Sequence, residues 1–493
     1  MPNQMIKLNE IRKFSGKQRT PGLPDTTIER FLANEPTLGQ AIDLAEEMHR
    51  LFSTEHTDWL RCDEEELRLL VQQHYVNFYP DPAINPYVAL GAAGPWIVTT
   101  HGAVLHDSGG YGMLGLGHAP GAVKEALARP WVMANVMTPS LSQKRLTDRL
   151  QAEIGHTRED GCPFAKFLCL NSGSESVTMA ARICDINARR QTDEGGRHSG
   201  KKIKQLAMEE GFHGRTTWPA RVSHSTRPVY RKHLASFRDR DDLEVVPIND
   251  VAALRDAFAR AEAEGVYFEA VFVEPVMGEG EPGRALDRAY YDACRELSRA
   301  HGALLVVDSI QAALRAHGCL SLVDYPGFAD CEAPDLETYS KALNAGQFPL
   351  SVLAMTQPAA DLYVKGVYGN TMTTNPRGLE VGIAVLDALN DELRSNIRER
   401  GVEFAAKLTA LGEEFPGAIT EVLGTGLILC AEMNPERYRV VGDGGLEQRL
   451  RHHGIEMIHG GHNGLRFTPH FAITTAEIDL IIDVLRQVLT EAG

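Results

Sequence analysis

The sequence lacks any cluster of Lys and Arg with interleaved aromatic residues, and its formal net charge is −16. An acidic chain without a basic patch is a poor match for a polyanion, so we expect no nucleic-acid partner. It also lacks a run of the roughly 18 to 20 apolar residues that a membrane span requires, and its first residues lack the apolar core of a signal peptide. The composition therefore predicts no membrane partner and a cytoplasmic location.

The eight cysteines are scattered, with no C-x-x-C pair and no grouping of Cys and His at the spacing of metal ligands. Such a pattern is typical of reduced thiols that serve mainly in packing, and it predicts no metal site. The chain contains no internal repeat and no low-complexity tract. These absences leave an ordinary globular protein as the expected class.

The chain has 493 residues, 43% of them apolar, which is enough for a large core and for two or three domains. Between about 145 and 375, short apolar runs alternate with helical segments. The runs are Phe167–Leu170, Ala270–Val273, Leu304–Val307 and Leu350–Ala354. This pattern predicts an α/β fold with a mostly parallel sheet covered by helices on both faces.

Composition and turn signals predict four regions. They are a helical N-terminal extension (1–85), the N-terminal part of a small domain with a linker (86–144), a large α/β domain (145–375) and a small α+β domain (376–493). In the extension, one core-facing helix is expected after a Thr37 cap and another after Asp63, the latter with apolar residues as far as Phe78. Trp96–Asp107 predicts two strands around a His101-Gly102 turn, followed by a glycine-rich loop.

Two residues point to a cofactor. Asp308 ends the apolar run Leu304–Val307, and Lys341 follows a short way downstream in Tyr339–Leu343. A lysine can form a Schiff base with the aldehyde of pyridoxal 5′-phosphate, and an aspartate at the end of a buried strand can keep the pyridine nitrogen protonated. The pair therefore favours a pyridoxal-phosphate site at the carboxyl ends of the strands.

The segment Leu170–Ser176, Leu-Asn-Ser-Gly-Ser-Glu-Ser, follows a predicted strand and opens a helix, so its N–H groups are suited to a phosphate. Three further motifs follow in order, and they are Gly211–Thr216, Val273–Glu279 and Tyr368–Pro376. Together with Asp308 and Lys341, these motifs resemble those of the class III (ornithine/4-aminobutyrate type) aminotransferases of pyridoxal-phosphate fold type I. The resemblance extends from about residue 96 to the C-terminus.

Matched position by position, the resemblance implies a set of cofactor contacts. Lys341 would form the Schiff base and move the substrate proton, and Asp308 would pair with the ring nitrogen. The remaining contacts would be Gly173 and Ser174 to the phosphate, Phe212 and Ile310 on the two ring faces, Gln311 near the ring hydroxyl, and Thr371 reaching the phosphate from the neighbouring subunit of a homodimer.

The resemblance also implies substrate contacts. Arg215 would hold the distal carboxylate of glutamate or 2-oxoglutarate, and Arg466 the α-carboxylate. Glu279 would cover Arg466 while an ω-amine donor is bound, and Tyr111 would contact that donor. The sequence does not identify the donor, the direction of flux or the purpose of the extension.

The leading hypothesis is thus an aminotransferase that moves the ω-amine of an amino acid such as ornithine, lysine or 4-aminobutyrate to 2-oxoglutarate. The same scaffold supports aminomutases, epimerases and decarboxylases, so these reactions stay open alternatives. A non-catalytic protein on the same fold is a third alternative. It is disfavoured because Lys341 and Asp308 are both present.

The chain departs from the family pattern at two places. Ser309 stands where an acid usually follows the aspartate, and Thr373 and Thr374 replace two glycines. Contacts in the first loop and the width of the entrance are expected to differ accordingly. His213, His317 and His470 flank the motifs, but a loop histidine is more often solvated than catalytic, so no role is assigned to them.

Overall fold

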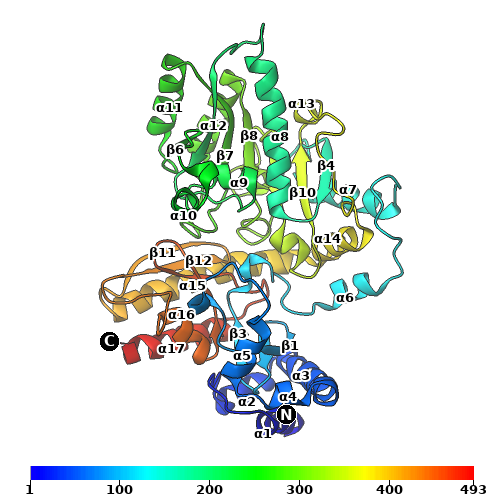
Figure 1. Cartoon of the computed structure of the whole chain (residues 1–493), viewed down its shortest axis with the longest axis vertical. Helices are drawn as coiled ribbons and strands as arrows, with labels where there is room; N and C mark the ends of the chain where they lie inside the picture. Colours follow the sequence, from blue (N-terminus) through cyan, green and yellow to red (C-terminus); the bar gives the residue numbers. More distant parts are fainter. Residues whose placement is uncertain (1, 493) are drawn as a thin grey trace. The chain divides into compact units, whose positions relative to one another are not determined.

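The computed structural model describes residues 2–492, and the chain divides into two compact units. Unit 1 comprises residues 1–124 and 399–493, and unit 2 comprises residues 125–398. The second boundary falls inside α15 (Asp391–Glu414), and the first inside α6 (Gly121–Ala128). Figure 1 shows the elements of each unit along the chain.

Unit 2 is built on a seven-stranded sheet of order β4-β10-β9-β8-β7-β5-β6. Its strands are β4 (Lys166–Leu170), β5 (Lys202–Met208), β6 (Leu243–Val246), β7 (Val266–Val273), β8 (Leu304–Asp308), β9 (Leu336–Tyr339) and β10 (Ser351–Met355). β10 is antiparallel to both of its neighbours, β4 and β9, and the other pairs of this sheet are parallel. The mostly parallel α/β fold expected from the apolar runs is confirmed, although the run at Leu350–Ala354 forms the antiparallel strand.

Helices cover both faces of this sheet (Figure 1). The helices of unit 2 are α7 (Leu141–Glu153), α8 (Gly173–Thr192), α9 (Thr217–Val222), α10 (Arg227–His233), α11 (Val251–Ala263), α12 (Arg288–His301), α13 (Gln357–Ala360) and α14 (Pro376–Ala388). The α8 helix packs Val177, Ile183 and Cys184 against Phe272 and Val306 of the sheet. Residues on both faces of β7 are buried, as expected for a central parallel strand.

Unit 1 contains two four-stranded sheets, of order β1-β2-β3-β13 and β11-β12-β15-β14. The strands are β1 (Ala89–Ala93), β2 (Trp96–Thr99), β3 (Val104–Asp107), β11 (Ile419–Thr425), β12 (Ile428–Met433), β13 (Ile455–Glu456), β14 (Ile458–Gly460) and β15 (Gly464–Phe467). Its helices are α1 (Pro2–Phe14), α2 (Asp25–Leu32), α3 (Pro36–Glu55), α4 (Thr57–Arg61), α5 (Glu64–Gln72), α16 (Leu446–His452) and α17 (Thr475–Ala492). The two strands expected around His101-Gly102 are confirmed as β2 and β3.

The N-terminal extension packs closely on the first of these sheets. A Cβ atom at Gly91 of β1 would come within 2.4 Å of the backbone nitrogen of Ala45 in α3, so only glycine permits this approach. Leu38, Ile42 and Ala45 of α3 are fully buried, as the helical spacing predicts. The extension is thus an integral layer of unit 1.

Two expectations for the extension were wrong in detail. The N-cap of α3 is Glu35, because Pro36 occupies the first helical position and needs no hydrogen-bonded N–H. The α5 helix begins with the expected Asp63 cap, but it ends at Gln72, so Phe78 lies beyond it and is 74% exposed. Of its apolar residues only Leu67 is buried.

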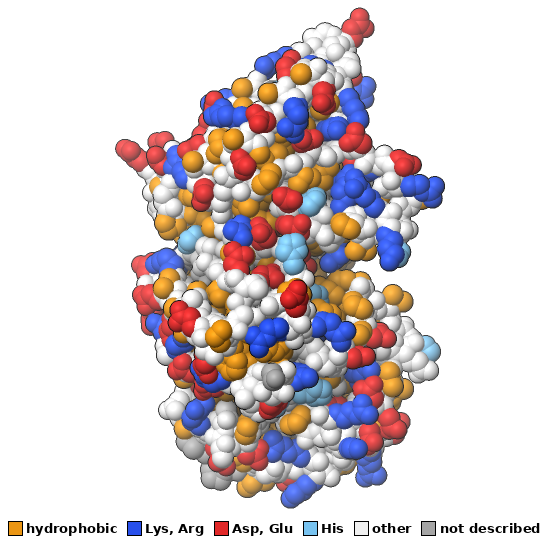
Figure 2. Space-filling model, turned by 90° about the vertical axis from the view of Figure 1, so that its left-hand side faces the viewer, with side chains coloured by type: hydrophobic (Ala, Val, Ile, Leu, Met, Phe, Trp, Pro, Cys, Tyr) orange, Lys and Arg blue, Asp and Glu red, His pale blue; other side chains and the backbone are white. Residues whose placement is uncertain are grey.

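No helix within residues 2–492 is long and apolar enough to cross a membrane. All eight cysteines are free thiols, and five of them are buried, in line with the packing role expected from their spacing. On the face shown in Figure 2, basic and acidic side chains are interspersed.

Candidate active site

The carboxyl ends of adjacent strands bring Asp308 and Lys341 to one edge of the sheet in unit 2. β8 and β9 are parallel, and Asp308 at the end of β8 pairs in register with Thr338 of β9. Lys341 follows Thr338 by three residues and opens a 3₁₀ turn (Lys341–Asn344). Because carboxyl ends of parallel strands share one edge, the register places the two residues at the same edge.

The backbone at Lys341 is unusual. Its φ is +42°, in the left-handed region that a residue with a side chain rarely adopts. Such a conformation costs on the order of 1–3 kcal/mol and is found mainly at functional sites. Lys341 is half-buried, and the flanking Ala342 and Ser340 are buried.

Asp308 is held rigidly by three donors. Thr338 Oγ1 donates to Oδ1 at 3.0 Å, and the Ile310 N–H donates to the same oxygen at 3.1 Å. His213 Nδ1 lies 2.8 Å from Oδ2, and both side chains are buried. Burial disfavours the charged imidazole, but the hydrogen bond and the charge of Asp308 outweigh it and raise the pKa of His213. The expectation that His213 is a solvated loop residue was therefore wrong.

A second buried acid positions Phe212. Glu274, directly after β7, accepts the Phe212 N–H at 2.8 Å and the Gly278 N–H at 3.2 Å. Burial raises the pKa of Glu274 to about 7, with His213 lowering it and Asp308 raising it further. The loop that carries Phe212 and His213 is thus fastened to the strand next to β8.

The residues expected around the cofactor fit a flat ring that bears a phosphate. A Cβ atom at Gly173 would come within 2.7 Å of Ile310, so a larger residue would displace the side chain expected on one ring face. Gly173 opens α8, whose Ser172 cap accepts from the Glu175 N–H, and Ser174 follows in the first turn. The Nε2 atom of Gln311 is buried with no protein partner among residues 2–492, which suits a donor to a ring oxygen.

Glu175 connects the start of α8 with the segment that carries Thr371. Its Oε1 accepts from Asn370 Nδ2 at 2.7 Å and from the Tyr368 hydroxyl at 3.1 Å, and its Oε2 accepts the Asn171 N–H at 2.7 Å. Thr371 itself is exposed. The segment Leu170–Ser176 and the Tyr368–Pro376 motif are therefore joined in one hydrogen-bond network.

Arg215 lies beside two other residues of the predicted site. Its guanidinium carbon is 5.3 Å from the centre of the Phe212 ring, and its Nη2 is 3.9 Å from Glu279 Oε1. The Arg215 side chain is 40% exposed. An ion pair this long and this exposed is weak.

Tyr111 and Arg466 belong to unit 1. Arg466 is buried on β15, opposite Cys430 of β12 and Ile458 of β14. Tyr111 has φ +48°, and it lines a pocket of about 320 Å³ together with Arg68 and Tyr79. Arg68 comes from α5, so the N-terminal extension contributes to the cavity that contains Tyr111.

Ser309 stands where the family usually has an acid, and it contacts a buried acid from another strand, Glu337. Ser309 Oγ and the Leu322 N–H donate to Glu337 Oε1 at 2.6 and 2.9 Å, and Ser321 Oγ donates to Oε2 at 2.6 Å. Glu337 is fully buried on β9, and burial raises its pKa to about 7. The acid thus stands on the neighbouring strand rather than next to Asp308.

The hydrogen-bonding residues of this site that were not predicted include His213, Glu274 and Glu175. Each lies within a motif that the sequence singles out. The sequence signal that could have identified Glu274 is its position. An acid that directly follows a buried parallel strand, as Glu274 follows β7, lies at the same edge of the sheet as Asp308.

Comparison with known proteins gives the family. The family model "Aminotransferase class-III" matches residues 80–489. Acetylornithine aminotransferase of Neisseria meningitidis is 30% identical over 428 residues, covering 85% of this chain and 98% of that protein. Ornithine aminotransferase 2 of Staphylococcus aureus is 29% identical over 408 residues, covering 82% and 94%.

Solved structures agree in fold. The ornithine aminotransferase of Toxoplasma gondii superimposes with a TM-score of 0.74 at 23% identity, covering 89% of this chain and 98% of that one. The ornithine δ-aminotransferase of Plasmodium falciparum gives 0.70 at 19% identity, covering 87% and 99%. With a family match that spans most of its length and a fold of type I, this chain belongs to the class III aminotransferases and is a pyridoxal-phosphate-dependent enzyme.

Proposed function

We propose that the enzyme transfers the ω-amine of an amino acid of the ornithine, lysine or 4-aminobutyrate type to 2-oxoglutarate. The observation that carries this proposal is Arg215, a cation that is 40% exposed and lies beside Phe212 and Glu279. A dicarboxylate acceptor needs such a cation for its distal carboxylate. The names of the two relatives, an acetylornithine and an ornithine aminotransferase, support the same donor class.

Each residue of the site has a part in this proposal. Pyridoxal 5′-phosphate, when bound, supplies a cationic ring that takes up the electron pair left on a carbon that loses a proton. Asp308 keeps the ring nitrogen charged, and His213 and Thr338 hold that carboxylate in place. Lys341 would anchor the cofactor and, as a free amine, would remove the proton from the substrate carbon that bears the amino group. Gln311 donates to the ring oxygen, and Gly173 and Ser174 contact the phosphate.

Absorption spectroscopy of the purified enzyme tests the two half-reactions. We expect the visible band of the lysine-bound cofactor to disappear with one donor of the panel ornithine, acetylornithine, lysine and 4-aminobutyrate. We expect it to return when 2-oxoglutarate is added. Repeated turnover of a donor, beyond one equivalent per active site, without any keto acid present would instead identify an isomerase and overturn the proposal.

The Arg215→Ala variant separates the two substrates. Loss of a charge-assisted contact to a carboxylate is worth about 1.5–3 kcal/mol, or roughly 10- to 150-fold. We expect kcat/KM for 2-oxoglutarate to fall by about this factor, while the half-reaction with the donor changes less. Arg190→Ala, an exposed arginine late in α8, is the matched control and should change neither. An unchanged 2-oxoglutarate half-reaction in Arg215→Ala would remove this acceptor from the proposal.

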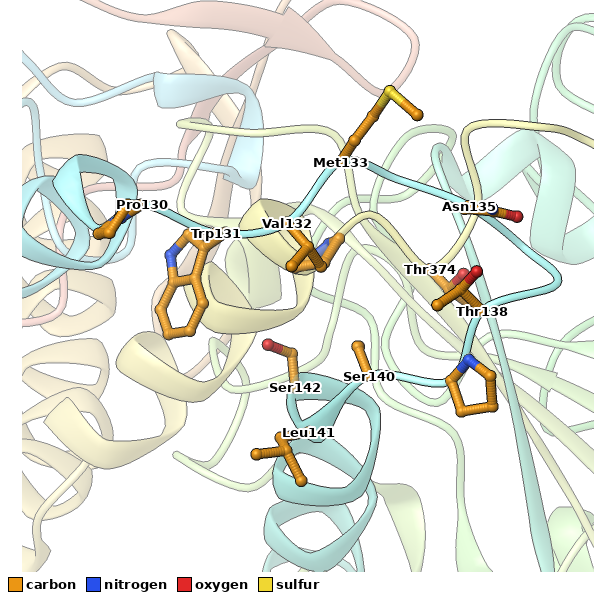
Figure 3. A pocket seen from close by; sticks show the side chains of 12 residues that line it. Pro130, Trp131, Val132, Met133, Asn135, Thr138, Ser140, Leu141, Ser142 and Thr374 are labelled. Atoms are coloured by element: carbon orange, nitrogen blue, oxygen red, sulfur yellow. The ribbon is translucent and has the colours of Figure 1, made fainter.

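We further propose that the enzyme is a homodimer in which Thr371 reaches the neighbouring site. Val132, Met133 and Met137 between α6 and α7 and Leu141 at the start of α7 are 61–84% exposed, and Met372, next to Thr371, is 54% exposed. Soluble monomers rarely expose so many large apolar side chains together. This segment and Thr374 line a pocket of about 460 Å³ (Figure 3). A second copy of the chain is the proposed occupant of this surface.

The double variant Met133→Glu/Met137→Glu tests this interface. Two charges in a buried apolar interface leave unpaired carboxylates, so we expect the variant to elute as a monomer in size-exclusion chromatography with light scattering. We also expect it to lose cofactor on dialysis. Val402→Glu, which replaces a single exposed apolar residue of α15, should remain dimeric. A double variant with the mass of the wild-type dimer would contradict the assignment of this surface.

A further inference from the structure

A buried cluster of two histidines and one glutamate lies in unit 1 and has no part in the proposed reaction. His106 is in β3, His470 follows β15, and Glu477 is in the first turn of α17. One ligand atom of each lies within 4.8 Å of the other two. His106 and Glu477 are separated by 371 residues, which is why the spacing of Cys and His in the sequence gives no sign of the cluster.

The two distances from the histidines to Glu477 in this His–Glu–His cluster match those between ligands of one metal ion. His106 Nε2 lies 3.2 Å from Glu477 Oε1, and His470 Nε2 lies 3.1 Å from the same oxygen. In a tetrahedral zinc site with bonds of 2.0–2.2 Å, neighbouring ligand atoms are about 3.3 Å apart. Both imidazoles thus direct the nitrogen that normally ligates metal at a single carboxylate oxygen.

Outer contacts fix two of these ligands. Ser108 Oγ lies 2.9 Å from Nδ1 of His106, the ring nitrogen that faces away from the cluster. The second oxygen of Glu477 accepts from the Thr474 N–H at 2.7 Å and from the Thr474 hydroxyl at 2.9 Å. Ligating histidines and carboxylates characteristically have such partners, which set the ring orientation and leave one atom for the ion.

The surroundings of the cluster allow an ion to enter and to be retained. The side chains of His106 and Glu477 are 0% and 1% exposed, whereas that of His470 is 12% exposed and gives access from solvent.

We propose that His106 Nε2, His470 Nε2 and Glu477 Oε1 bind a divalent transition-metal ion, with Zn²⁺ the best match for two imidazoles and a carboxylate. Water completes the tetrahedron. The ion joins β3, the turn after β15 and the start of α17, so its role is to stabilise unit 1. The alternative is a cluster in which both imidazoles only donate hydrogen bonds to Glu477.

The His470→Gln variant distinguishes a metal site from a hydrogen-bonded cluster, because glutamine can still donate a hydrogen bond to Glu477 but is a poor zinc ligand. Untagged full-length enzyme, produced with Zn²⁺ and then dialysed, is analysed for metal by mass spectrometry. We expect about one zinc per wild-type chain, as a single three-ligand site implies, and little in His470→Gln. A strong chelator should lower the melting temperature of the wild type by several degrees and leave that of the variant unchanged.

His459→Gln is the matched control, because His459 lies in the same unit and contacts Glu447 at 3.1 Å without a second histidine. It should retain the zinc. If the variant cannot be purified, Co²⁺ added to chelator-treated wild type provides a second readout through the intense visible bands of a tetrahedral site. Equal zinc in wild type and His470→Gln, or a wild type whose melting temperature does not respond to chelator, would overturn the metal site in favour of hydrogen bonds alone.

Discussion

Lys341→Ala is expected to lower kcat for transamination by at least about 10⁴-fold. In the proposed reaction, the substitution removes both the covalent attachment of the cofactor and a base whose proton transfer alone is worth about 10²- to 10⁴-fold. The variant should also lack the visible absorption band of the lysine-bound cofactor. Steady-state kinetics with the donor found in the spectroscopic panel measures the first effect, and the spectrum of the purified protein measures the second.

Lys365→Ala is the control, since Lys365 is an exposed lysine of the same unit. It should match the wild type in both measurements. A Lys341→Ala enzyme that keeps the band, or more than about one per cent of wild-type kcat, would show that another residue carries the chemistry, because loss of a base costs at least that much.

Asp308→Asn is expected to lower kcat by about 10²- to 10³-fold, the range for removal of one preorganised electrostatic contact in a buried site. Asparagine has nearly the same shape, so Thr338 and Ile310 retain a carbonyl-type acceptor. What is lost is the negative charge that keeps the ring nitrogen protonated. Because Lys341 is untouched, the cofactor should remain attached, and the visible band should remain with altered intensity.

Asp324→Asn is the control for Asp308→Asn, because both aspartates are buried. Asp324 is 4% exposed and accepts the Gly155 and Thr157 N–H groups in the same unit, away from β8. Its substitution should lower the melting temperature and leave kcat nearly unchanged. If Asp308→Asn shows the same pattern as Asp324→Asn, its carboxylate is structural rather than part of the reaction.

The sequence predicted the central strands of unit 2 well, for a physical reason. Strands buried on both faces are continuous apolar runs, and β7 and β8 are such runs. β9 was harder to recognise because it carries Glu337 and Thr338, polar residues whose partners come from other segments. The antiparallel direction of β10 was also unreadable, because side-chain pattern does not encode the direction of a neighbouring strand.

The sequence predicts a candidate site residue where the chemistry of the cofactor requires one residue type. It does not predict residues that hold such a residue in place from distant parts of the chain. Lysine at 341 and aspartate at 308 follow from the chemistry of the cofactor. His213 supports Asp308 from 95 residues away, and no local pattern separates a buried loop histidine from a solvated one. The same holds for His470 and His106, which meet only after the chain has folded.

The packing of α3 on β1 bears on where this chain can be divided. The match to the class III family begins at residue 80, but the hydrophobic layer that covers β1 comes from residues before it, and Gly91 lies against Ala45 across that boundary. The segment that the family shares and the segment that folds together are therefore not the same stretch of chain. Residue 80 is a poor point at which to join this protein to a relative, because a chimaera made there would separate two surfaces that pack closely on each other.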